Sequence, residues 1–466
     1  MLRKRVLLAS FLLAALTVLL PAQQPGSSRR PVTTETEEPV TFNKQISRIL
    51  QAHCQTCHHP GDIAPFALIN YQDAYDHRQA MLYQTGNRIM PPWHVNSECI
   101  DFQDNPSLTV EEIRDIRRWV DSGAPEGAPA DLPPPMKFNS GWSLGQPDLI
   151  LAMDEPMTPD FSKGDVYRCF VLPTNLSEDR YVSAAEILPG SRAMVHHVLL
   201  FVDTSTKSQE LDSQDPGPGY TCFGGPGFSF VYALGGWAPG NRPKLLPDGV
   251  AMFLPKNSRV VMQVHYSAHS GKREADRTEV GLYFSKVPVQ KTLLALPIIN
   301  TSFRIPAGAS NYKVTASLPY NLSSLPVDIH LLGVTPHMHL LGKKMTLTAT
   351  APDKKQLCLV DVPNWDFHYQ ATYSYKDPIA LKTGTRVNLT AYYDNSSDNP
   401  DNPNSPPVDV GWGENTSDEM CIAFLHFTLD AETPIPGLAK TNLSSFFKFW
   451  EVDLAPSDRG VARNRH

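Results

Sequence analysis

The chain has 466 residues, enough for two or three domains that each bury a core of their own. Its formal net charge of -7 excludes the basic surface that nucleic-acid-binding proteins need, so we expect no nucleic-acid partner. Its 42 prolines and 28 glycines, with 41% hydrophobic residues, favour a loop-rich β protein over a helical one.

Residues 1–22 have the pattern of a secretory signal peptide. A basic segment ending at Arg5 precedes an apolar run from Val6 to Leu20, and Pro21-Ala22-Gln23 offers a small-residue cleavage site. The alternative is a membrane anchor, but the apolar run is short for a bilayer span. We therefore expect an exported chain without a transmembrane span after signal cleavage.

Two helices are predicted on either side of a cysteine motif. Apolar residues recur at helical spacing from Phe42 to Leu50. Further on, Thr109 and Glu112 form a capping box, and Gly123 ends the apolar stripe that follows. The segment over residues 40–127 is therefore predicted to be a small all-α domain.

Between these helices, Cys54, Cys57 and His58 form the Cys-x-x-Cys-His pattern of covalent haem attachment. The two thiols bond the vinyl groups, and the histidine faces the iron. A zinc site is the rival interpretation, but it would need a second ligand pair nearby. The motif predicts one haem c in a cytochrome c-like domain, and haem attachment of this kind indicates a bacterial periplasm.

The sixth iron ligand is predicted to be Met90, which lies in a proline-fixed loop before the last helix. A thioether there would raise the haem potential. Met81 and His94 are the alternative ligands, and a buried core methionine is the alternative reading of Met90.

A Pro-rich linker over residues 128–145 is predicted to end this domain. The hydrophobic period then changes to alternation, separated by Gly/Pro/Asn/Asp clusters. The clearest runs are Val195–Val202, Arg259–Tyr266, Lys344–Thr350 and Arg386–Tyr393. This spacing predicts two all-β sandwich domains, over residues 146–297 and 298–456, divided by a break near residues 293–308.

Imidazole and thioether side chains in the β region form a candidate copper set. His337 and His339 are two residues apart, so on a strand both imidazoles leave the same face. His196 and His197 are adjacent, so sharing one metal requires a bulge or a strand end. The full set is His196, His197, His265, His337, His339 and Met420.

Four of these residues have a structural alternative. Taken alone, His196 and His197 are typical of one core and one surface histidine. His265 could be a core histidine whose hydrogen bonds are made within the protein, and Met420 could be a methionine that packs in the core. Other histidines have no paired ligand in the sequence and are predicted not to bind metal. These are His269, His330, His368 and His426.

Four segments resemble, in the same order, the copper-ligand segments of the copper type II, ascorbate-dependent monooxygenases. That family includes peptidylglycine α-hydroxylating monooxygenase and dopamine β-monooxygenase. The segments are Met194–Phe201, Val261–Tyr266, His337–Lys343 and Thr416–Cys421, and the resemblance covers residues 148–451. It implies two jelly-roll domains that face each other across a wet cleft.

The resemblance also assigns the ligands. It implies that His196, His197 and His265 hold a copper that stores an electron. The second copper, held by His337, His339 and Met420, would then be the site of O₂ binding and hydroxylation.

The activity implied is hydroxylation of a C–H bond, with O₂, in an organic small-molecule or peptide substrate. Family members take electrons from ascorbate. Here the fused haem domain suggests a relay from an ascorbate-like reductant or a periplasmic redox protein. The alternative is a non-catalytic periplasmic haem/copper electron-transfer or copper-binding protein.

Departures from the family pattern narrow the substrate. Thr335 stands where the peptide-hydroxylating member has a carboxylate-binding arginine, and Ile422 and Phe424 replace polar residues. A more apolar substrate than a peptide carboxylate is therefore expected. Cys421 also lacks the disulfide partner that it has in the family. Two cysteines are assigned to haem, so five remain and at least one of them is unpaired within the chain. The suggested pairings are Cys358–Cys421 and Cys169–Cys222.

Overall fold

The computed structural model describes residues 38–60, 64–138, 141–222, 225–228, 232–238, 241–268, 271–318, 325, 327–367, 369–413 and 415–429. The predicted signal peptide, His269 and His368 lie outside these ranges. The described residues from Val40 onward belong to one compact unit. Among the described residues, no helix is both long enough and apolar enough to cross a membrane.

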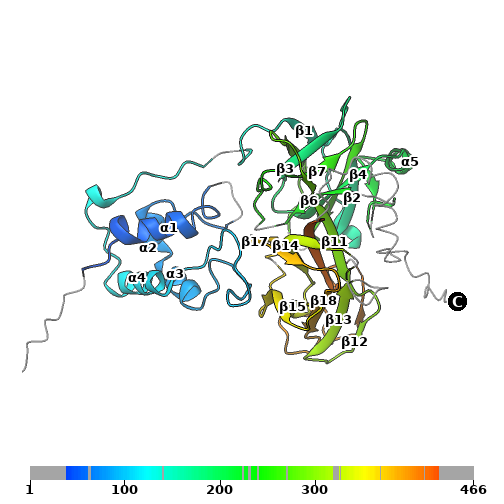
Figure 1. Ribbon diagram of the computed structural model, residues 1–466. Helices are drawn as coiled ribbons and strands as arrows, with labels where there is room; N and C mark the ends of the chain where they lie inside the picture. Colours follow the sequence, from blue (N-terminus) through cyan, green and yellow to red (C-terminus); the bar gives the residue numbers. More distant parts are fainter. Residues whose placement is uncertain are drawn as a thin grey trace, which may run out of the picture. The chain divides into compact units, whose positions relative to one another are not determined.

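The first part of this unit is helical (Figure 1). A π-helical turn η1 (Phe42–Ile46) leads into α1 (Ser47–His53), followed by α2 (Tyr71–Asp76), α3 (Arg78–Gly86) and α4 (Val110–Asp121). At the start of α4, the side chain of Thr109 accepts a hydrogen bond from the backbone N–H of Glu112, and the side chain of Glu112 accepts one from the backbone N–H of Thr109. The predicted capping box is therefore present. Helices α2 and α3 were not predicted from the sequence.

These helices share a core that is separate from the β core. Ile46, Leu50, Ile116 and Trp119 are fully buried in it. The linker after α4 contains a short 3-10 turn, η2 (Pro129–Asp131).

The next part contains two five-stranded sheets. One has the order β1 (Leu149–Ala152), β9 (Glu279–Phe284), β3 (Arg180–Leu188), β7 (Val250–Leu254), β10 (Lys291–Thr292). The other has the order β5 (Tyr220–Thr221), β2 (Val166–Pro173), β8 (Arg259–Tyr266), β4 (Val195–Asp203), β6 (Tyr232–Trp237). A 3-10 turn η3 (Phe161–Lys163) and helix α5 (Lys207–Gln214) lie between strands. Successive strands mostly alternate between the two sheets, as in double-sheet sandwiches.

The last part contains two four-stranded sheets. One has the order β11 (Leu294–Ile299), β20 (Ile422–Leu429), β14 (Ile329–His337), β17 (Tyr373–Leu381). The other has the order β13 (Tyr312–Leu318), β18 (Arg386–Tyr393), β15 (Gly342–Thr350), β16 (Gln356–Val362), and a ribbon joins β12 (Arg304–Ile305) to β19 (Val410–Gly411). The structure is therefore mostly β, as predicted.

The division between the two β parts was predicted near residues 293–308, and strand β11 begins inside that range. Ile298 and Ile299, at the predicted break, are residues of β11, which pairs along its length with β20. Both side chains are buried. The second part thus begins at or before Leu294, because β11 completes its sheet.

The segment between α3 and α4 packs on the second β part. Phe102 forms a β-bridge with Tyr375 and stacks on its ring, with centroids 5.3 Å apart. A disulfide joins Cys99 to Cys358 on β16. The suggested Cys358–Cys421 pairing is therefore wrong: Cys421 is buried as a free thiol.

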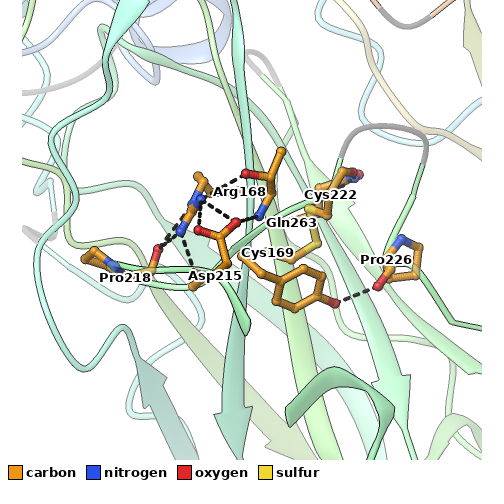
Figure 2. The surroundings of a disulfide bond; sticks show 10 residues. Arg168, Cys169, Asp215, Pro218, Cys222, Pro226 and Gln263 are labelled. Carbon is orange, nitrogen blue, oxygen red and sulfur yellow. Dashed lines mark hydrogen bonds and ion pairs between the residues drawn. A yellow bond between two sulfur atoms is a disulfide. The ribbon is translucent and has the colours of Figure 1, made fainter. Parts of the chain in front are cut away.

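The suggested Cys169–Cys222 pairing is confirmed. Figure 2 shows its surroundings, where the guanidinium of Arg168 donates to both carboxylate oxygens of Asp215 and to the carbonyl of Pro218. Gln263 donates to the carbonyl of Cys222 at 2.8 Å (Figure 2). Because residue 263 lies on the same face of β8 as residue 265, this network braces the strand beside a predicted metal ligand.

Candidate metal centres

Three predicted ligands converge in the first β part. His197 on β4 is the register partner of His265 on β8. The register shifts between Val195 and His197, which is the irregularity that two adjacent histidines need to share a metal. The Nδ1 of His197 lies 3.3 Å from the Nδ1 of His196 and 3.3 Å from that of His265. One ring nitrogen from each residue lies within 4.8 Å of the others, close enough to ligate a single ion.

The second ring nitrogen of His265 is held by a carboxylate. Nε2 lies 3.0 Å from Oδ2 of Asp165, and the ring of Tyr167 stacks on the imidazole with centroids 4.2 Å apart. Burial alone would raise the pKa of Asp165, but its hydrogen bonds with His265, Thr416 and Ala268 hold that pKa well below its usual range. His265 thus directs Nδ1 into the cluster.

The pKa of His197 is also set by its surroundings. Burial lowers the pKa of this imidazole well below its usual value, and the neighbouring histidines lower it further. The ring is therefore neutral at physiological pH, the form that can ligate a metal.

A second pair of predicted ligands lies in the other β part. Strand β14 ends at His337, so the prediction that both histidines lie on one strand holds for His337 but not for His339. Their rings are nevertheless adjacent, with centroids 5.2 Å apart. The Nδ1 of His337 lies 2.6 Å from Oε1 of Gln370, and that of His339 lies 3.1 Å from the carbonyl oxygen of Asp418. Both residues consequently offer Nε2.

The pKa values of this pair favour the neutral imidazole. Burial lowers the pKa of His337 to about 4, although its hydrogen bond with Gln370 opposes the shift. Burial and the nearby His337 hold the pKa of His339 well below its usual value.

The backbone of Met420 shares a hydrogen-bond acceptor with the backbone of His339. One carboxylate oxygen of Glu419, Oε2, accepts hydrogen bonds from the backbone N–H groups of His339 and Met420, each at 3.0 Å. The other oxygen, Oε1, accepts from Leu341 at 2.7 Å. Burial raises the pKa of Glu419 to about 8 even though these backbone bonds oppose the shift. The methionine segment and the histidine turn are therefore held together by one buried carboxyl group.

The haem-motif residues lie at the end of α1. The backbone N–H groups of Cys57 and His58 both bond the carbonyl of Cys54, so a tight turn gathers the motif. The Nδ1 of His58 lies 3.0 Å from the carbonyl oxygen of Phe66, which leaves Nε2 for a ligand. Burial lowers the pKa of His58 and keeps the imidazole neutral.

The candidates for a sixth iron ligand lie in different surroundings. Met90 is 41% exposed, whereas Met81 is buried in the helical core. His94 lies against the second β part, with its ring 5.5 Å from that of Tyr369. Met90 stays a prediction as an iron ligand.

Two histidines predicted not to bind metal are described. His426 on β20 is half-buried, and its Nε2 lies 2.8 Å from Oγ1 of Thr335, which also lies 2.8 Å from Oγ1 of Thr372. His330 lies near the start of β14. His426 thus belongs to a polar cluster with Thr335, the residue that stands in place of an arginine in the pattern described above.

No sequence pattern identified Asp165, Gln370 or Glu419, which hydrogen-bond to the predicted ligands. Asp165 lies 100 positions from His265, and Gln370 lies 33 positions from His337, so no local spacing links them. Glu419 directly precedes Met420, but a lone carboxylate in a loop gives no signal of burial. Only the folded chain brings these residues to the ligands.

Residues 291–440 match the family model for the C-terminal domain of the copper type II ascorbate-dependent monooxygenases, an oxidoreductase family. The match includes His337, His339 and Met420, and it begins just before β11. No curated protein matches the chain.

Among solved structures, the chain is similar to a peptide-N(4)-(N-acetyl-β-D-glucosaminyl) asparagine amidase, with 12% identity over 62% of this chain and 97% of that chain, at a TM-score of 0.27. It is also similar to the major capsid protein P2 from bacteriophage PM2, with 6% identity over 61% of this chain and 98% of that one, at a TM-score of 0.24. At such scores neither likeness supports an argument about this protein.

Proposed function

We propose, from the premise that this chain is a copper type II monooxygenase, that it hydroxylates a C–H bond of an organic substrate and receives electrons through a fused haem c. The convergence of the ring nitrogens of His196, His197 and His265 within 4.8 Å supports this proposal most directly, because it lies outside the part matched by the family model. The net reaction would consume R–H, O₂, two electrons and two protons, and yield R–OH and water.

The ligand residues fit two copper ions. The first cluster offers three Nδ1 atoms, and the second offers two Nε2 atoms beside a methionine whose backbone shares the Glu419 carboxylate with His339. Copper bound there would supply dioxygen activation and one-electron transfer. An all-imidazole set tolerates both oxidation states, whereas a thioether favours Cu(I). The assignment of the second set to hydroxylation and of the first to electron storage follows from that difference.

The chain's own residues would keep both sets ready for metal. Gln370 and Asp165 each bond one ring nitrogen of a ligand and so direct the other nitrogen inward. Burial keeps His197 and His339 neutral, so no proton has to leave before metal binds.

The helical segment would hold the haem. Cys54 and Cys57 would form the thioether bonds, His58 would ligate the iron through Nε2, and Met90 is the proposed sixth ligand. The hydrogen bond from His58 to the Phe66 carbonyl fits that role, because it orients the ring. We further propose that the exported chain works in a bacterial periplasm, where an ascorbate-like reductant or a redox protein would reduce the haem.

The substrate would be more apolar than a carboxylate-terminated peptide. The side chains at the departing positions are Thr335, Ile422 and Phe424, and none has a charge to pair with a carboxylate. Ile422 is the register partner of His337, and Phe424 that of Thr335.

Metal and haem content of the purified mature protein is the first test. Two coppers per covalent haem in the wild type, with one lost in Met420→Ala and one in His265→Ala, would support both sites. Oxygen uptake that depends on an added organic substrate would then support turnover. Fewer than one copper after copper loading would overturn the monooxygenase proposal.

The alternative function is a non-catalytic periplasmic haem/copper electron-transfer or copper-binding protein. The same residues would bind copper and haem in such a protein. Full copper and haem occupancy, without oxygen consumption for any member of a broad set of apolar substrates, would favour that alternative.

A further inference from the structure

We infer that Asp165 is a positioning residue: it fixes His265 in the tautomer that presents Nδ1 to copper and, through Thr416, links the three-histidine cluster to the loop that contains Met420. This inference rests on the proposed copper sites. It concerns a residue that neither the sequence motifs nor the family match identifies.

Asp165 is held in place by the strand pair that contains His265. It immediately precedes β2, where Tyr167 is the register partner of His265. Its Oδ1 accepts a hydrogen bond from the backbone N–H of Ala268 at 2.8 Å. Only 6% of the Asp165 side chain and 3% of the His265 side chain are exposed. A carboxylate so placed has little freedom to turn away from the imidazole.

The other oxygen, Oδ2, selects the tautomer. It lies 3.0 Å from Nε2 of His265, and an ionised carboxylate only accepts hydrogen bonds, so Nε2 must carry the proton. In the neutral imidazole Nδ1 is then the lone-pair nitrogen, and it lies 3.3 Å from the Nδ1 of His197. The inward nitrogen is thus prepared for metal before metal arrives.

The same Oδ2 reaches the other β part. It accepts a hydrogen bond from the hydroxyl of Thr416 at 2.6 Å. Thr416 is buried, and it lies in a loop that a bridge between Trp412 and Glu419 closes. Within that loop, the carbonyl of Asp418 and the carboxylate of Glu419 both bond His339. One carboxylate oxygen is therefore shared by a ligand of the first set and by the loop that positions the second.

Asp165→Asn provides a sharp test, because it changes charge without changing shape. The backbone N–H of Ala268 requires an acceptor at the Oδ1 position, so the amide oxygen would lie there and the NH₂ group would face His265. Nε2 would then have to accept, and the proton would move to Nδ1. We expect the copper affinity of the three-histidine cluster to fall about 10- to 100-fold. Asp148→Asn, which removes a carboxylate paired with Lys286, is the matched control and should bind copper as the wild type does.

Copper affinity is measured by chelator competition in the Met420→Ala background, where copper at the three-histidine cluster is the expected remaining site. The tautomer is measured separately, by ¹⁵N NMR of histidine-labelled, metal-free full-length protein. We expect an Nε2–H resonance for His265 in the wild type and an Nδ1–H resonance in Asp165→Asn. Thr416→Val should keep the Nε2–H tautomer, because the bond between Asp165 and His265 remains.

The outcomes separate this inference from the proposed function. An Nδ1–H tautomer in the wild type, or unchanged copper affinity in a folded Asp165→Asn, would overturn the role of Asp165 even if two coppers bind. A wild type that binds no copper would overturn the proposed function, while the NMR measurement would still decide the tautomer. If Asp165→Asn does not fold, the wild-type tautomer alone decides.

Discussion

The rings of Phe367 and His196 are stacked, with centroids 4.7 Å apart and 19° between their planes. The same phenyl ring stands edge-on to the imidazole of His339 at 5.9 Å. Phe367 therefore contacts one ligand of each metal set, from the loop between β16 and β17. Its ring would fix the spacing across which the two proposed copper ions would exchange electrons.

Replacing this ring should slow that exchange without removing metal. We expect Phe367→Leu to bind two coppers per chain, because no ligand is lost, but to turn over roughly 10- to 100-fold more slowly, since small misplacements of reacting groups are costly. Reoxidation of the prereduced protein by O₂, followed by electron paramagnetic resonance, measures the step. Phe253→Leu, on β7 in the sheet without the histidines, is the control. An unchanged rate in Phe367→Leu would contradict the assigned role.

Glu419→Ala should destabilise the metal-free protein. The substitution leaves the backbone N–H groups of His339, Leu341 and Met420 buried without their acceptor. At about 1–3 kcal/mol for each unsatisfied group, partly relieved by water, we expect a loss of about 2–5 kcal/mol in the free energy of unfolding. Denaturant titration of the variant and of the exposed control Glu98→Ala measures it. Equal stability of the two variants would be the contrary result.

His426 should make stability depend on pH. Burial lowers its pKa from 6.5 to about 4, so between these values the unfolded chain binds a proton that the folded chain does not. Its contribution is full above pH 6.5 and is lost as the pH falls toward 4. The apparent free energy of unfolding of the metal-free protein should therefore drop over that window. His426→Gln should flatten the curve in part, because His337 has a similarly lowered pKa. A variant with the full wild-type slope would show that His426 is not responsible.

The Cys99–Cys358 disulfide should hold the segment between α3 and α4 on the second β part. It closes a loop across a sequence separation of 259, so its removal should cost about 2–5 kcal/mol. We expect the double variant Cys99→Ser, Cys358→Ser to unfold at a lower temperature and to be cut more rapidly by protease within residues 93–104. Ser97→Ala, at an exposed position of the same segment, is the control. Cleavage rates equal to those of the control would rule out this role.

Several features followed from the sequence because their causes are local. The predicted strands Arg259–Tyr266 and Arg386–Tyr393 have the same bounds as β8 and β18. The Thr109 and Glu112 capping box is present because its two hydrogen bonds need only the first turn of α4. The bulge at His196 could be anticipated because strand geometry offers adjacent side chains few ways to share a metal.

Other features depend on contacts that spacing does not encode. Helices α2 and α3 were missed because, of their residues, only Ala74, Met81 and Thr85 are buried, which leaves little apolar periodicity. The pairing of β11 with β20, over 120 residues away, is one such contact. The partner of Cys358 was misassigned because Cys99 reaches it only when the segment around Phe102 packs on β17.

The sequence by itself determined the types and the order of the predicted ligands, because side-chain chemistry restricts which residues bind copper or haem. Tertiary structure alone decided which ring nitrogen each histidine presents. That choice depends on Asp165 for His265, on Gln370 for His337 and on the Asp418 carbonyl for His339. A hydrogen bond to one nitrogen of an imidazole fixes the role of the other, and each of these partners lies more than 30 residues from its histidine in the chain.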